Sequence, residues 1–140
     1  MATGVLRATI AEAHAAKGQN REALDLLLAA IKDGWEIATP LVARAKLLRK
    51  LGEHGKAFAD MMKADEINPT LVAIETDRWL AANSRDIGGH LFHGLHKERS
   101  FPADAIADYR AAIAAKPRDG FDQLAQNKAR ERMRSLGQKL

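Results

Sequence analysis

The chain has 140 residues, of which 46% are hydrophobic and 29% charged, with a formal net charge of +4. This composition is typical of one globular domain, and the chain is large enough to bury a hydrophobic core without disulfide bonds or bound metals. The absence of cysteine excludes disulfides, zinc–thiolate sites, iron–sulfur clusters and thiol nucleophiles. No apolar run reaches the roughly 18 residues of a membrane-spanning helix, and the start shows no leader pattern. We therefore expect a soluble, cytoplasmic protein without a membrane span.

The residue types favour an all-α fold. Alanine, which has the highest helix propensity, makes up about a fifth of the chain. The prolines are Pro40, Pro69, Pro102 and Pro117, and each stands where a helix begins or has just ended, because proline cannot continue a helix interior. No stretch shows the alternation of a strand.

Hydrophobic spacing and these breaks predict a series of helices in chain order. The expected ranges are 4–17, 21–33, 40–51, 55–67, 71–83, 87–99, 102–116 and 120–138. In the helix over 71–83, Trp79 is expected to be the apolar anchor. The helix over 120–138 has Phe121, Leu124, Met133 and Leu136 among basic residues, and we expect it to cover the helix before it.

An internal repeat is the most informative feature of the sequence. Gly52 follows Gly18 by 34 residues, and the positions after both glycines match; a third copy follows after an insertion. The three copies are Gly18, Ala23, Leu27, Ala30 and Trp35; Gly52, Ala57, Met61, Ala64 and Pro69; and Ser100, Ala105, Tyr109, Ala112 and Pro117. Small alanines beside one large residue are typical of a helix that packs closely against a neighbour.

This period, and the segments KLGEHGKAF over 50–58 and DEINP over 65–69, resemble the tetratricopeptide repeat family. The resemblance implies stacked antiparallel helix pairs, an α-solenoid with repeats over 4–37, 38–71 and 86–119, an inserted helix and a C-terminal capping helix. The first helices depart from the family pattern. Their corresponding positions hold Arg7, Ile10, Ala11 and His14; Leu41, Arg44, Ala45 and Leu48; and Gly89, Phe92, His93 and His96.

The resemblance also implies a protein-binding function, with a partner held on the concave side that the first helices line. The lining positions would be Val5, Ala8, Glu12, Thr39, Val42, Lys46, Arg49, Lys50, His90 and Lys97. Like charges gathered on a concave surface favour an acidic partner, so Lys46, Arg49 and Lys50 predict an acidic or amphipathic segment of another protein. The alternative is a solvated helix face that happens to be basic.

Two other functions compete with protein binding. His90, His93 and His96 have a spacing that places neighbouring imidazoles on one helix face, where they could ligate a metal. Gly88, Gly89 and Gly94 loosen that helix, so packing and surface histidines are the preferred interpretation.

We expect no cofactor and no enzymatic activity, since no catalytic set stands out. The other alternative is binding to RNA or DNA through basic residues near the C-terminus, which are Lys128, Arg130, Arg132, Arg134 and Lys139.

Overall fold

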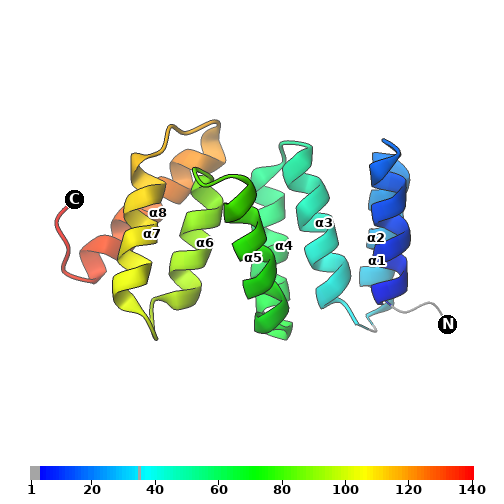
Figure 1. The fold of residues 1–140 in the computed structure, drawn as a ribbon, viewed down its shortest axis with the longest axis horizontal. Helices are drawn as coiled ribbons and strands as arrows, with labels where there is room; N and C mark the ends of the chain where they lie inside the picture. Colours follow the sequence, from blue (N-terminus) through cyan, green and yellow to red (C-terminus); the bar gives the residue numbers. More distant parts are fainter. Residues whose placement is uncertain (1–3, 35) are drawn as a thin grey trace. The chain divides into compact units, whose positions relative to one another are not determined.

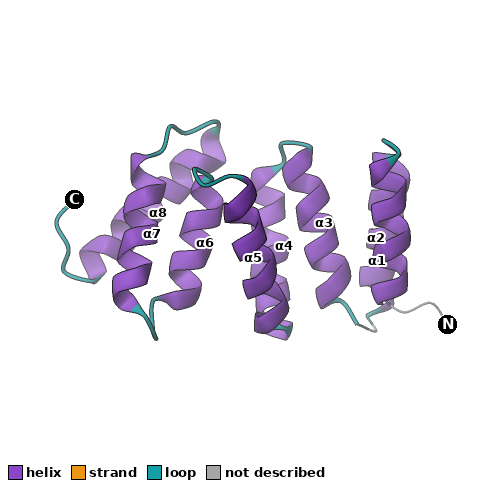
Figure 2. Cartoon of the chain, viewed as in Figure 1, coloured by secondary structure: helices purple, strands orange, loops and turns teal. Residues whose placement is uncertain are grey.

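The computed structural model describes residues 4–34 and 36–140, and within them it contains helices, turns and loops but no strand (Figures 1 and 2). The prediction of an all-α protein is confirmed, and each helix begins and ends within a few residues of its expected bounds. The helices of this part are α1 (Gly4–Ala16), α2 (Asn20–Asp33), α3 (Ala38–Lys50), α4 (His54–Ile67), α5 (Pro69–Ala82), α6 (Ile87–Lys97), α7 (Pro102–Ala114) and α8 (Gly120–Ser135). Trp35, the last position of the first repeat copy, lies outside the described residues.

The chain divides into two compact units, Met1–Val72 and Ala73–Leu140, with the boundary inside α5. The first unit holds α1 to α4, and the second holds most of α5 together with α6, α7 and α8. That residues 1–140 form one domain remains a prediction.

The core of the first unit consists of small and large apolar residues at the repeat positions. Helices α1 and α2 pack together, α3 and α4 pack together, and α3 also contacts α1 and α2. The central cluster contains Ala8, Ala11, Ala23, Leu27, Ala43 and Leu47. The short alanine side chains let the helix backbones approach closely, while Leu27 and Leu47 fill the space between them.

Within each of the two helix pairs of this unit, the same kind of turn connects the first helix to the second. Gly18 and Gly52 have φ of 78° and 82°, a left-handed conformation that glycine adopts without a steric penalty. After each, a backbone N–H donates across the turn, from Gln19 to the carbonyl of His14 at 2.9 Å and from Glu53 to that of Leu48 at 2.8 Å. These bonds satisfy carbonyls at the helix end. The glycines of the repeat therefore serve to reverse the chain.

In the second unit, α6 packs against α7, and α8 packs against both. The repeat positions of α7 are buried as the pattern predicts, with Ala105, Tyr109 and Ala112 each 0% exposed. Trp79 of α5 is also buried, in agreement with its expected role as an anchor.

Helix α6 shows that the sequence alignment of the third repeat was wrong by one residue. A Cβ on Gly94 would lie 2.5 Å from Cε1 of Tyr109, so Gly94 is the small residue that faces the large one of the next helix. Ala11 and Ala45 hold this position in α1 and α3, and both are 1% exposed. The equivalent first-helix positions in α6 are thus His90, His93, Gly94 and Lys97. Glycine is needed here because Tyr109 is larger than Leu27 or Met61.

Helix α8 packs on α6 and α7 through part of the apolar set expected from the sequence, together with small residues. Ala125, Ala129 and Met133 are buried, whereas Leu124 is 69% exposed, which corrects its assignment to the covering face. The side-chain amide nitrogen of Gln126 donates to the backbone carbonyls of Ala112 at 3.1 Å and Ala115 at 2.7 Å. Helix α8 therefore also provides hydrogen-bond donors for carbonyl groups at the C-terminal end of α7.

Candidate partner-binding groove

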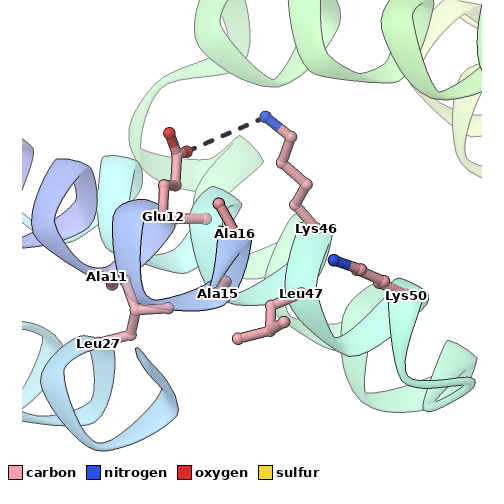
Figure 3. A pocket seen from close by; sticks show the side chains of 9 residues that line it. Ala11, Glu12, Ala15, Ala16, Leu27, Lys46, Leu47 and Lys50 are labelled. Carbon is pink, nitrogen blue, oxygen red and sulfur yellow. Dashed lines mark ion pairs between the residues drawn. The ribbon is translucent and has the colours of Figure 1, made fainter. Parts of the chain in front are cut away.

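A groove with a volume of about 250 Å³ lies in the first unit between α1 and α3 (Figure 3). It is lined by Ala11, Glu12, Ala15, Ala16, Leu27, Ala43, Lys46, Leu47 and Lys50. We call the space between these residues the α1–α3 groove. Its floor consists of the apolar side chains of Ala11, Leu27 and Leu47, which are 1%, 1% and 6% exposed.

The groove is hollow because its walls carry short side chains. Ala11 and Ala15 lie one turn apart on α1, so they present the same helix face, and Ala43 adds a third methyl group from α3. Larger side chains at these positions would fill the space, as they do in a packed core. The small residues that let α1 approach α2 therefore also leave room beside α3.

Charged side chains stand at the rim above this floor. Nζ of Lys46 lies 4.0 Å from Oε1 of Glu12, and the two side chains are 50% and 56% exposed. An exposed ion pair of this kind contributes little net free energy, so a bound group can replace either partner. Lys50 lies one turn beyond Lys46 on α3 and forms no ion pair with any residue that the structure describes. The rim thus has an excess of positive charge.

The structure brings together only some of the residues predicted to bind a partner. Glu12, Lys46 and Lys50 line the groove. Val42 is 7% exposed and belongs to the core, and Arg49 is half-buried on α3 outside the lining. His90 and Lys97 belong to the second unit. The alanines at 11, 15 and 43 were not predicted to line the site, although two alanines four residues apart could have indicated a recess.

His90 and His93 are held by a carboxylate instead of being arranged around a metal. Nδ1 of His90 lies 2.8 Å from Oδ1 of Asp108, and Nδ1 of His93 lies 2.5 Å from Oδ2 of the same residue. His96 instead stacks on Phe92, with ring centroids 6.4 Å apart. Over the described residues, no group of three potential ligands is placed to hold a metal ion.

Asp108 occupies a repeat position that also carries a carboxylate in the first unit. Asp60 lies three residues after Ala57, and Asp108 lies three residues after Ala105. The carboxylate of Asp60 accepts hydrogen bonds at 2.8 Å from both Nε and a terminal nitrogen of Arg44. In the corrected alignment Arg44 corresponds to His93. The same position therefore joins the first and second helix through a hydrogen-bonded carboxylate in both units, which gives His93 a structural role.

The contacts of His90 favour its charged form. Nε2 of His90 lies 2.6 Å from the carbonyl oxygen of Ser84, so both ring nitrogens face acceptors and only the imidazolium can donate to both. The hydrogen bond to Asp108 raises the pKa of His90 most, and the charge of Asp86 adds to the shift. The groups that act on this ring are thus Asp108 on α7 and Ser84 and Asp86 in the turn before α6, while His93 on α6 shares the carboxylate of Asp108.

We predict that the second unit loses stability as pH rises. Because the folded pKa of His90 is raised, its stabilising contribution is complete below the unfolded pKa of about 6.5 and disappears as pH rises through the folded value. The expected loss is about 1 kcal/mol, the net value of one hydrogen bond. Urea unfolding from about pH 6 to about pH 9 measures it, and His90→Gln should flatten the profile. An identical slope in His90→Gln would refute this role.

Among the described residues, no helix combines the length and the apolar character that a bilayer crossing requires. Compared with models of known families, with curated proteins and with solved structures, the chain gives no match.

Proposed function

We propose that this protein is a non-enzymatic interaction module built from tetratricopeptide-like helix pairs. Supporting this proposal, the repeat positions are buried in each second helix, and the same kind of glycine turn connects the two helices within each of the first two pairs. Repeat folds of this kind present extended surfaces to partners. Its proposed location is the cytoplasm, because a chain without cysteine needs no oxidising compartment.

The α1–α3 groove is the proposed binding site, and the observation that carries the proposal is an apolar floor beneath a rim with excess positive charge. An acidic or amphipathic segment of another protein would place an apolar side chain over Ala11 and Ala15 and a carboxylate beside Lys46 or Lys50. Burial of the apolar group provides affinity, and the charge complementarity favours an acidic partner over a basic one.

Neither catalysis nor nucleic-acid binding is proposed as the principal function. The residues that line the groove include no hydroxyl, thiol or imidazole group, and we propose no cofactor. Of the basic residues near the C-terminus, Arg132 donates to Glu98 at 2.8 Å and Lys128 lies 3.3 Å from Glu131. These pairs reduce the positive charge available to a phosphate backbone.

We predict that Lys46→Glu combined with Lys50→Glu reduces recovery of the natural partner at least tenfold. The double change reverses the rim charge and adds repulsion against an acidic segment. Affinity capture from a lysate of the source cells, followed by quantitative mass spectrometry, measures the change. Circular dichroism should show unchanged helix content.

The matched control is Lys63→Glu combined with Lys32→Glu, which alters net charge equally outside the groove. Lys32 and Lys50 both lie in the last turn of a helix, so their substitutions disturb the helix dipole to the same degree. Equal loss of partner in both double variants would contradict the groove assignment. Loss of nucleic acid rather than protein from the captured material would favour the alternative function.

A further inference from the structure

The two walls of the α1–α3 groove carry opposite charges, which restricts what the groove accepts. Glu12 stands on the α1 wall, while Lys46 and Lys50 stand on the α3 wall (Figure 3). Lys46 is engaged by Glu12 across the opening, with Nζ and Oε1 4.0 Å apart. A carboxylate on a ligand therefore competes with Glu12 for Lys46 but meets no competing carboxylate at Lys50.

We propose that the groove selects segments with a single carboxylate beside an apolar side chain, and that Glu12 is the residue that rejects polyacidic segments. This inference rests on the proposed function of the groove. One carboxylate neutralises the excess positive charge of the rim at Lys50. A second carboxylate in the groove lies against Glu12, where like charges repel.

The size of the groove sets the apolar part of the ligand. Its volume of about 250 Å³ exceeds the roughly 150 Å³ of a cavity that accommodates benzene, so it has room for one leucine or phenylalanine side chain. The apolar side chains of the floor and the alanine methyl groups of the walls offer that side chain only apolar contacts. The ligand is thus a short segment in which one large apolar residue lies next to one acidic residue.

The test uses three blocked synthetic peptides of equal length and the isotope-labelled full-length chain. Each peptide contains one central leucine; the first has one glutamate beside it, the second has three glutamates around it, and the third has glutamine in place of all glutamates. Amide chemical shifts of Ala15, Ala16 and Lys46 report binding in the groove. Each peptide is titrated into the wild-type chain, into Glu12→Gln and into the control Glu53→Gln.

Glu53 is a matched control because its environment resembles that of Glu12. Its carboxylate lies 4.0 Å from Nζ of Lys56, its side chain is 53% exposed, and it lies outside the groove. Its substitution removes the same charge and the same kind of exposed ion pair. Any effect of Glu12→Gln that Glu53→Gln does not share therefore arises in the groove.

We expect the wild-type chain to bind the single-glutamate peptide more tightly than the other two. Glu12→Gln should strengthen binding of the three-glutamate peptide about fivefold, the size of one exposed charge interaction, and strengthen binding of the single-glutamate peptide by a smaller factor, because only one carboxylate then gains from the freed Lys46. Equal effects on both acidic peptides, or none, would overturn the selectivity of Glu12 and leave the groove function intact. If no peptide shifts the groove amides in any variant, the proposed function itself fails, together with this inference.

Discussion

Truncation of the chain after Gly120 is expected to unfold the second unit, at a cost on the order of 5 kcal/mol or more. Loss of Met133 alone removes a buried side chain worth about 2 to 5 kcal/mol, and Ala125 and Ala129 are buried beside it. Since the stability of a whole domain is only about 5 to 15 kcal/mol, a unit that loses α8 retains little or none.

Polar contacts of α8 add to this expected loss. Arg132 donates to Glu98 of the turn after α6, and the hydroxyl of Tyr109 donates to the same carboxylate at 2.9 Å. The hydrogen bond from Arg132 is the largest cause that lowers the pKa of Glu98, which keeps the carboxylate ionised. Without Arg132, the Glu98 carboxylate loses the positive charge that balances it.

Circular dichroism and analytical ultracentrifugation of the truncated chain measure this prediction. We expect lower helix content, a lower unfolding midpoint and association through the exposed faces of α6 and α7. A control with Arg130→Gln and Arg134→Gln keeps α8 but reduces its positive charge. A truncated chain that stays folded and monomeric, and loses only a salt-sensitive affinity for RNA or DNA, would show that α8 is a nucleic-acid arm.

The largest effect expected of a single substitution is that of Trp79→Ala, at about 3 to 5 kcal/mol. The side chain of Trp79 is 3% exposed, so its removal loses both apolar burial and packing contacts. Urea unfolding followed by circular dichroism gives the change in free energy. Trp79→Phe, which retains an aromatic ring, should lose substantially less, and an unshifted midpoint in Trp79→Ala would show that α5 is not anchored by this residue.

The helices and their buried faces could be predicted from the sequence because they depend on local periodicity. The repeated alanines and the large residue between them are buried in α2, α4 and α7 as expected. Gly18 and Gly52 could be identified as turns since their spacing matches the repeat. Leu124 was predicted wrongly because an apolar residue in an amphipathic pattern does not show which neighbour covers it.

The binding residues were predicted less completely, since they depend on distances between helices. Lys46 and Lys50 could be chosen as a basic cluster on one helix. Their position above an apolar floor follows from the packing of α3 against α1. No pattern within a single helix predicts that packing. Arg49, from the same cluster, is half-buried outside the groove, because a helix that packs on two neighbours exposes only part of its surface.

The helical character of the chain, the positions of its helices and the buried residues of the second helices follow from the order of amino acids, because each of these depends on spacing along one segment. The contacts of Asp108 with His90 and His93, the place of Gly94 opposite Tyr109 and the contact of Glu12 with Lys46 follow instead from the packing of the helices. These contacts join residues of different helices. Their geometry is set by how closely the helices approach, which depends on side-chain volumes on both partners at once.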